Sequence, residues 1–278
     1  MHKNRRIGKL EGTIFSLLGF LWAFGCIFPI WKVFCATFSK ETSNLTTVIL
    51  PDSFSNGVSK MYTALTSVNV MQATMNTAVY TLIAIVGMLI MCSLASYEFS
   101  FYNFPGKKFL FSVLMGAMML PFILYVVPLY RFVYRLGLTD TYLGVAIPIM
   151  ISPMSVFILN QFSETIPSSL VESARIDGAS HFQIFFRIYL PLVRNGLITV
   201  TVLMFLRAWG SYMWPALVTG NNILPVSRTI ANLLSKYFYV DARVKMAAML
   251  LAMIPPMAIY VIFQKHVIEG MTMSSVKG

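Results

Sequence analysis

Long uncharged apolar runs alternate with short polar segments along this 278-residue chain. Five runs contain no Asp, Glu, Lys or Arg, and a sixth contains a single Arg; the six are Thr13–Trp31, Thr74–Tyr97, Phe109–Tyr130, Thr141–Phe162, Gly196–Asn221 and Met246–Phe263. Each is close to or longer than the roughly 18 to 20 residues that cross about 30 Å of hydrocarbon. Because a helix satisfies its own backbone hydrogen bonds in lipid, the pattern predicts an all-α membrane protein with six transmembrane helices, folded as one domain over residues 1–278.

Prolines within these runs predict kinks in the helices, because a proline removes a backbone donor and clashes with the preceding turn. The kinks are expected at Pro121 and Pro128 in the third run, Pro148 and Pro153 in the fourth, and Pro255 and Pro256 in the sixth. Kinks suit a bundle that rocks around a transport pathway, but packed membrane helices also carry proline without moving. Both interpretations stay open at this point.

The composition independently places the chain in a bilayer. Hydrophobic residues make up 57% and charged residues 11%, and the mean hydropathy is +0.73, whereas a soluble domain of this length needs far more charge. The net charge of +11 suits anionic lipid headgroups. No segment interleaves basic and aromatic residues on a soluble face, so no nucleic-acid partner is expected. The three Cys lack CxxC spacing and the three His are isolated, which predicts packing cysteines and no metal site.

The N-terminal segment carries Lys3, Arg5, Arg6 and Lys9 ahead of the first apolar run. A secretory signal peptide also has a basic start, but its apolar core is about 7 to 15 residues long. The 19-residue run, with no small-x-small cleavage site close behind it, favours a retained first helix. The positive-inside rule then predicts cytoplasmic N- and C-termini, with eleven Lys or Arg inside and nine outside. This asymmetry is weak, so the predicted orientation rests mainly on the cations of the first nine residues.

The polar segment between the fourth and fifth runs predicts two short helices joined at a glycine. Pro167 suits a helix start, and Ser169-x-x-Glu172 has capping-box spacing. Gly178 can take the left-handed conformation that ends the first helix. The second helix has residues of one apolar face at i, i+3, i+4 and i+7, namely Phe182, Phe185, Phe186 and Tyr189. A plain pair of surface helices explains Glu172 and Gly178, but not the spacing that continues to Pro191.

The same segment resembles the signature of the membrane subunits of binding-protein-dependent ABC importers. That signature is a Glu-Ala-Ala triplet, a Gly four residues on, and Ile-x-Leu-Pro ten residues after the Gly. Here it reads Glu172-Ser173-Ala174, Gly178 and Ile188-Tyr189-Leu190-Pro191, with Ser173 in place of the first Ala. The sequence Arg-Ile-Asp-Gly-Ala at residues 175–179 resembles that of the carbohydrate branch of the family, the permeases related to the smaller membrane subunit of the maltose importer.

The resemblance implies the type I ABC importer permease fold, with residues 163–191 as a cytoplasmic coupling loop between helices four and five. In the family this loop docks into a separate ATPase subunit, and the matched positions here are Glu172, Ser173, Ala174, Asp177, Gly178, Ala179, Ile188, Leu190 and Pro191. It also implies a second homologous permease subunit, two ATPase subunits, an extracellular solute-binding protein and a carbohydrate substrate, in the cytoplasmic membrane of a bacterium or archaeon.

The chain lacks the means to use ATP itself. No G-x-x-x-x-G-K-[ST] occurs in the sequence, so no loop is expected to cradle the phosphates of a nucleotide. We therefore expect no enzymatic activity and no cofactor in this chain. The resemblance implies that ATP and Mg²⁺ are bound by the partner ATPase.

Candidate pathway residues lie in the fifth run; they are Arg207, Trp209, Tyr212 and Trp214. A charge at membrane depth costs about 2.5 to 3.5 kcal/mol unless it faces protein or water, so Arg207 is a candidate pathway or interhelix residue. The rings could stack on sugars, although aromatic residues near an interface are more often anchors. In the maltose-type family the partner permease can hold the sugar alone. Trp209-Gly210 also departs from the Trp-Asn pair common in the family, which puts a carried-over role for that site in doubt.

The outer segment 220–244 resembles the region that family members present to the binding protein, and the candidate contacts are Asn221, Asn222 and Arg228. The coupling motif indicates that an ATPase subunit is bound but says nothing of the solute. A permease for glycerol phosphate or another polar solute is therefore an alternative to a carbohydrate permease. An intramembrane enzyme would need a catalytic pair at membrane depth, and a secondary transporter a buried carboxylate; the predicted helices contain neither.

Overall fold

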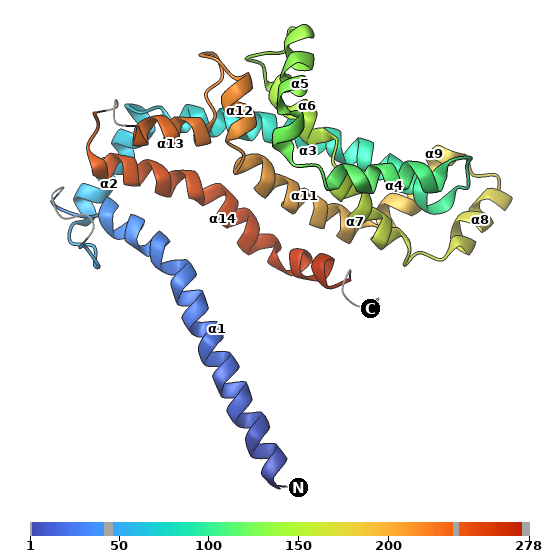
Figure 1. Cartoon of the computed structure of the whole chain (residues 1–278), viewed down its shortest axis with the longest axis horizontal. Coiled ribbons are helices and arrows are strands. Elements are labelled where there is room, and N and C mark those ends of the chain that lie inside the picture. The colour runs from blue at the N-terminus through green and yellow to red at the C-terminus, as the bar shows by residue number, and fades with distance from the viewer. Residues whose placement is uncertain (1, 42–46, 236–238, 274–278) are drawn as a thin grey trace. The chain divides into compact units, whose positions relative to one another are not determined.

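The computed structural model describes residues 2–41, 47–235 and 239–273, and the secondary structure within these ranges is all helical (Figure 1). The chain falls into two compact units. The first takes in the residues up to Met71 together with Ile230–Met253, and the second takes in Gln72–Thr229 and the chain from Ile254 onward.

The described ranges contain three helices that are long and apolar enough to cross a membrane. They are α1 (His2–Thr37) from Glu11 onward, α3 (Val70–Phe101), and α14 (Ala242–Met273) up to His266. Three bent helix pairs pass the same test: α4 (Lys107–Met118) with α5 (Phe122–Arg135) at 103°, α6 (Tyr142–Met150) with α7 (Pro153–Ser163) at 45°, and His181–Leu192 with α11 (Arg194–Trp209) at 74°. Six spans result if each bent pair counts as one, in agreement with the predicted fold class.

Proline lies at two of the three breaks. Pro121 is the extended N-cap of α5, and Pro153 is the first residue of α7. A residue before proline is driven out of the helical region, and Ser152 is extended accordingly, with φ −121° and ψ 97°. Pro128 and Pro148 lie inside α5 and α6, and α14 runs on through its two prolines. The predicted interruptions are therefore sharpest at Pro121 and Pro153.

The fifth apolar run does not form one helix, contrary to the prediction of a continuous span over Gly196–Asn221. α11 ends at Trp209, and α12 (Met213–Val218) starts after a gap of three residues. Pro215 explains the break, because inside a longer helix it would leave the Ser211 carbonyl without its donor. At the third position of α12 the missing N–H has no partner to lose. The Ser211 carbonyl instead accepts the Ser227 hydroxyl at 2.8 Å.

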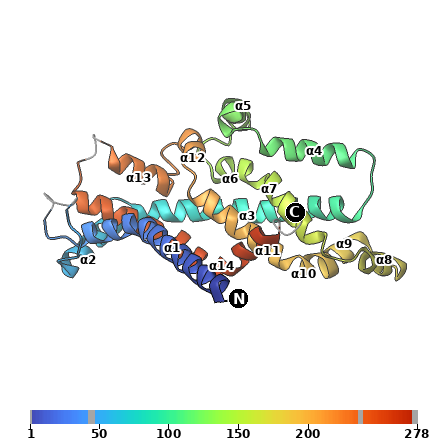
Figure 2. The same ribbon diagram turned by 60° about the horizontal axis from the view of Figure 1, so that its bottom comes forward.

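The core of the second unit forms where α7 packs against α3, α4 and α11 (Figure 2). Its buried side chains come from three helices; they are Ile85, Met88 and Cys92 of α3, Val156 and Leu159 of α7, and Val200 and Met204 of α11. Two glycines permit close approach. A Cβ on Gly87 would lie 2.6 Å from the Met150 sulfur, and one on Gly196 would lie 2.8 Å from the Phe162 ring.

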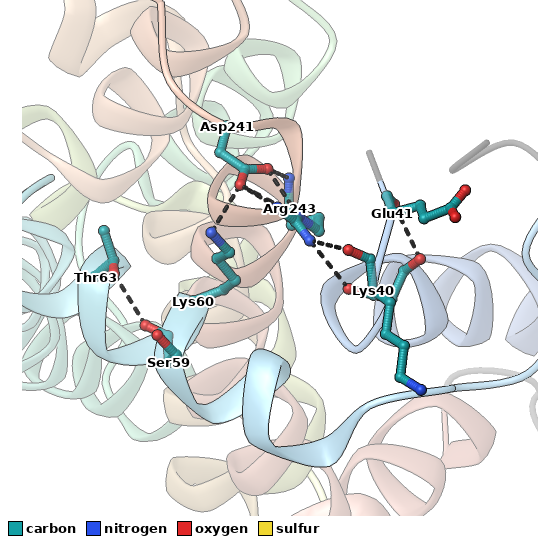
Figure 3. Close-up of polar contacts among 8 residues, drawn as sticks. Lys40, Glu41, Ser59, Lys60, Thr63, Asp241 and Arg243 are labelled. Atoms are coloured by element: carbon teal, nitrogen blue, oxygen red, sulfur yellow. Dashed lines mark hydrogen bonds and ion pairs between the residues drawn. The ribbon is translucent and has the colours of Figure 1, made fainter. Parts of the chain in front are cut away.

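The first unit holds a cluster of charged side chains, drawn in Figure 3. The Asp241 carboxylate lies 2.7 Å from Lys60 Nζ of α2 (Phe54–Thr66) and 2.7 Å from Arg243 Nη2. Arg243 Nη1 donates to the carbonyls of Ser39 and Lys40. Hydrogen bonds from Arg243 hold the pKa of Asp241 well below its usual value, against the effect of burial and with help from Lys60. Beside this cluster, α2, α13 (Val226–Leu234) and α14 share an apolar core.

Candidate functional site

The candidate coupling loop forms the predicted pair of short helices with a glycine between them. α8 (Ser168–Ile176) ends in a Schellman motif, in which the N–H of Gly178 donates to Arg175 O and the N–H of Ala179 donates to Ala174 O, each at 3.0 Å. Gly178 has φ +82°, and a Cβ there would meet no atom within 4 Å. The backbone conformation alone therefore favours glycine at this position. α9 (His181–Ile184) begins three residues later.

The predicted capping box is wrong at Ser169 and occurs at Ser180 instead. Ser169 is the second residue of α8, whose N-cap is Pro167 without a side-chain hydrogen bond. At α9 the Ser180 hydroxyl accepts the backbone N–H of Gln183 at 3.3 Å, and the side-chain Oε1 of Gln183 accepts the backbone N–H of Ser180 at 2.8 Å. The Glu172 side chain is exposed on α8 and does not cap the helix.

The motif residues divide between two faces of the loop. Five of them are exposed: Glu172, Ser173, Asp177, Gly178 and Pro191. The other four are half-buried and pack against an apolar cluster; they are Ala174, Ala179, Ile188 and Leu190. The apolar half of the motif thus packs the loop against the membrane helices, and the other half is exposed.

Aromatic rings join this loop to the C-terminal end of α3. The Tyr97 ring centroid lies 5.4 Å from that of Phe185 and 5.1 Å from that of Tyr189, and Phe101 meets Tyr189 edge-on at 5.9 Å. The hydroxyls of Tyr97 and Tyr102 are 2.8 Å apart. We call these five residues the α3–loop aromatic cluster. Figures 1 and 2 both place α8 and α9 at this end of α3.

Within the cluster, Tyr102 touches both arms of the loop. Its ring stacks on His181 of α9 with centroids 4.8 Å apart, and the guanidinium carbon of Arg175 in α8 lies 4.2 Å from its centroid. Its carbonyl accepts Lys107 Nζ at 2.9 Å. Sequence reasoning missed the α3 members of this cluster. Their only signal was three aromatic residues at the polar end of an apolar run.

After α9 the chain continues through a π-helical turn, η1 (Phe185–Tyr189), into α10 (Leu190–Leu192) and α11. Leu190 N–H donates to Phe185 O, the spacing that defines a π turn. Phe185 and Tyr189 point into the cluster, whereas Phe182 is 71% exposed and Phe186 is 59% exposed. The prediction that all four residues form one apolar face is therefore wrong for Phe182 and Phe186. Ile176 of α8 is likewise exposed, and exposed large apolar side chains of this kind are common at protein contacts.

Three of the four candidate pathway residues line one cavity of about 310 Å³ in the second unit. They are Arg207, Tyr212 and Trp214. Trp209 is buried elsewhere, with its ring stacked on Phe205 at 5.3 Å. The cavity lies where the α4–α5 and α11–α12 segments are interrupted.

Two of the candidate binding-protein contacts, Asn221 and Asn222, lie on the loop after α12, and the third, Arg228, lies in the first turn of α13. Asn221 and Asn222 are exposed. Arg228 is half-buried and its guanidinium is used within the chain, where Nη1 donates to Thr219 Oγ1 at 3.1 Å and to Gly220 O at 3.0 Å. The arrangement leaves the two Asn side chains available to a partner and gives Arg228 a role in shaping the loop.

Asp140 fixes the other side of this loop. It has φ +57°, and its N–H donates to Val218 O at 2.7 Å. Its carboxylate accepts the N–H groups of Gly220, Asn222 and Ile223 at 2.7, 3.0 and 3.1 Å. Burial alone would raise the pKa of Asp140, but these donors hold it below the usual value. The residue was not among the sequence-predicted sites, since its partners lie about 80 positions away.

Broken membrane spans together with an exposed, glycine-jointed helix pair are the features of a multi-span membrane protein. Residues 89–273 match the family described as "Binding-protein-dependent transport system inner membrane component", and the chain belongs to this family. It is accordingly a permease component of an ABC transporter in the cytoplasmic membrane, multi-pass, and not itself the ATPase. The predicted family, fold class and absence of ATPase function are confirmed.

Relatives match along nearly the whole chain. It is 29% identical over 282 residues to the sn-glycerol-3-phosphate transport system permease protein UgpE of Rhizobium meliloti (strain 1021), and 31% identical over 285 residues to UgpE of Agrobacterium fabrum (strain C58), with 98% of both chains covered each time. It is 28% identical to the arabinooligosaccharides transport system permease protein AraQ of Halalkalibacterium halodurans, over 94% of this chain and 95% of AraQ.

A solved structure shows the same fold. It is the crystal structure of a bacterial ABC transporter involved in the import of the acidic polysaccharide alginate. The match has a TM-score of 0.80 at 22% identity, and covers 92% of this chain and 96% of the matched chain.

Proposed function

We propose that this chain forms half of the translocation pathway of an ATP-driven importer of carbohydrate. The other parts are a second homologous permease subunit, two ATPase subunits that bind ATP and Mg²⁺, and an extracellular solute-binding protein. Family membership supports a binding-protein-dependent complex. The number and kind of the partner subunits are part of the proposal.

The observation that carries the proposal is the two-faced coupling loop. Glu172, Asp177 and the apolar Ile176 stand exposed on α8, while the opposite side of the loop is packed on the end of α3. A surface of exposed apolar and acidic groups on a rigid support is suited to a groove on another protein. We propose that α8 and the turn at Gly178 dock into the ATPase subunit.

The orientation follows from this role. We propose that the coupling loop and both termini face the cytoplasm, with the 219–225 loop outside. Ser169→Cys and Asn221→Cys, each in a cysteine-free background, would be treated in spheroplasts with a membrane-impermeant maleimide. Asn221→Cys should react in intact spheroplasts and Ser169→Cys only after permeabilisation. The reverse pattern would invert the proposed topology.

The solute class rests on the relatives. AraQ is named for arabinooligosaccharides and UgpE for sn-glycerol 3-phosphate. We propose carbohydrate for this chain, with glycerol phosphate as the alternative that the UgpE relatives favour. Uptake of a labelled arabinooligosaccharide and of labelled sn-glycerol 3-phosphate into the same liposomes, each with competition by the unlabelled solutes, separates the two.

The coupling role is tested in liposomes that hold the complete importer and its binding protein. Glu172→Lys reverses a charge on the exposed face of α8, and Gly178→Asp places a side chain at φ +82°. Both should lower solute uptake and solute-stimulated ATPase activity together. Glu11→Lys is the matched control, since it makes the same charge reversal on the exposed surface of α1.

Assembly is measured in parallel by co-purification of the two permease subunits. Loss of uptake with the permease pair intact supports docking at α8. Wild-type uptake and ATPase stimulation in both variants would reduce the segment to a capped surface helix pair and remove the basis of the proposal.

A further inference from the structure

A cavity in the second unit combines a single positive charge with hydroxyl and aromatic groups. It has a volume of about 310 Å³. Arg207, Ser211, Tyr212 and Trp214 line it from the α11–α12 interruption, and Phe122 and Tyr125 line it from the start of α5. Interrupted membrane helices are a recurrent place for solute sites, because they free polar groups at membrane depth. Ligand pockets begin at about 300 Å³, so the cavity accommodates one sugar-sized unit.

Arg207 is the one charged residue among those that line the cavity. It lies near the end of α11, is exposed, and makes no hydrogen bond or ion pair with the part of the chain that the structure describes. A guanidinium cannot lose its proton in a protein, and it is costly in lipid unless it meets water or an anion. Its planar donors match a carboxylate or phosphate with two parallel hydrogen bonds.

The neighbouring groups are held in place around this charge. The Trp214 indole N–H donates to Val145 O at 3.2 Å, and Phe122 meets the Trp214 ring edge-on with centroids 6.3 Å apart. Phe122 also contacts the Tyr125 ring at 5.2 Å. These aromatic faces offer an apolar wall for the carbon skeleton of a solute, while Ser211 and the two tyrosines offer hydroxyls. No Asp or Glu lines the cavity to repel an anion.

We infer that this cavity binds the oxyanion of the transported solute, a carboxylate or a phosphate ester, through Arg207. The inference rests on the proposed transport function and narrows its solute class to acidic sugars or sugar-like phosphates. The aromatic rings contact the carbon skeleton, and the guanidinium selects the charge. A neutral oligosaccharide would leave Arg207 without a partner during its passage.

The first test measures binding to the purified permease pair, without ATPase or binding protein, through quenching of tryptophan fluorescence. The probes are sn-glycerol 3-phosphate and glucuronate, with glycerol and glucose as neutral counterparts. The wild type should bind the two anions more tightly than the neutral molecules. Arg207→Gln should weaken anion binding about 10- to 100-fold, because a charge-assisted hydrogen bond is lost, and should leave neutral binding unchanged.

Control variants separate this site from other effects of charge. Arg207→Lys should keep part of the anion preference, since it retains the charge without the planar pair of donors. Arg131→Gln removes an exposed cation from the same unit outside the cavity and should bind like the wild type. Tighter binding of the phosphate assigns a phosphate ester, and tighter binding of glucuronate assigns a sugar acid.

Three results would overturn the inference. Equal binding of all four probes would do so, and so would an Arg207→Gln variant that binds the anions as tightly as the wild type. The third is failure of the Arg207→Gln permease pair to assemble, with rescue by Arg207→Lys, which would place the guanidinium against an acid of the second subunit.

The transport assay keeps this inference distinct from the proposed function. Uptake of neutral oligosaccharide that is unaffected by Arg207→Gln but abolished by Glu172→Lys would overturn the anion site and leave the importer role intact. Normal uptake and ATPase stimulation in both the Glu172 and the Gly178 variants would instead count against docking at α8 and leave the anion site untouched.

Discussion

Replacing Asp140 by Ala should release the loop that carries Asn221 and Asn222. The carboxylate accepts three backbone N–H groups from residues 220, 222 and 223, so one side chain fixes the whole turn. A Cβ on Gly220 would come within 2.7 Å of Asp140 Oδ2, so a side chain at position 220 would displace the carboxylate.

The magnitude follows from the number of hydrogen bonds and their exposure. A hydrogen bond to a charged group contributes about 1.5 to 3 kcal/mol. Asp140 is half-buried and Asn222 is exposed, so water replaces part of each lost hydrogen bond. The net loss is then about 1 kcal/mol per hydrogen bond. Asp140→Ala should therefore lower the free energy of local opening by about 2 to 3 kcal/mol, a change of about 30- to 150-fold in the opening equilibrium.

Hydrogen–deuterium exchange with mass spectrometry, on peptides that cover residues 218–225 of the permease pair, measures this opening. In Asp140→Ala the amides of Gly220, Asn222 and Ile223 should exchange faster by that factor. Peptides from α3 and α7 should be unchanged and serve as the internal control.

Two further variants separate charge from backbone strain. Asp140→Gly keeps a residue that tolerates φ +57° and loses the carboxylate, so it should behave like Asp140→Ala. Asp140→Asn keeps the oxygen that receives Gly220 and Ile223 but turns an amide nitrogen toward Asn222, so exchange should rise mainly at Asn222. Unchanged exchange in Asp140→Ala, or wild-type protection in Asp140→Gly, would refute the carboxylate clamp.

Four other outcomes are expected. Because the pKa of Asp140 is lowered in the folded state, the ionised carboxylate stabilises the loop fully above about pH 4, and this stabilisation is lost as the pH falls through the folded-state pKa. The protection of residues 218–225 against hydrogen exchange, corrected for intrinsic rates, should fall over that pH range in the wild type and not in Asp140→Asn. Gly178→Ala should destabilise the loop by about 1 kcal/mol through backbone strain, seen as a lower solute-stimulated ATPase rate, and Gly178→Asn should be milder. Tyr102→Ala should reduce ATPase stimulation, whereas Tyr102→Phe, which keeps the ring, should not. Asp241→Asn should lower the thermal unfolding midpoint by about 2 to 4 °C at low salt, by weakening the pairs in Figure 3, and by less at high salt.

Local chemistry in the sequence predicted the coupling loop only in part. Gly178 was predictable because glycine has few competitors at positive φ. The helix start was not, since two similar patterns, Ser169-x-x-Glu172 and Ser180-x-x-Gln183, lie close together and the spacing alone fits both. In the structure Pro167 is the N-cap of α8, so Ser169 lies inside the helix and only the Ser180 pattern forms a capping box.

The membrane spans show the same limit. Apolar run lengths predicted the all-helical fold and six spans, and the described residues hold six if each bent helix pair counts as one. They did not predict that the fifth run divides, because hydropathy does not register a missing backbone donor at Pro215. The contacts of Tyr102 with Arg175 and His181 join residues more than 70 positions apart, and no local pattern encodes such a pairing.

Because the α3–loop aromatic cluster contains residues from outside the coupling loop, the loop cannot be exchanged between relatives by itself. Tyr97 and Phe101 of α3, with Tyr102 directly after it, supply much of the apolar surface against which α8, α9 and η1 pack. A chimera that carries only residues 163–193 of a relative would inherit a surface shaped for that relative's α3. Exchange of residues 97–102 in the same step would restore the match, and substitutions in these two segments should accompany one another as the family diverges.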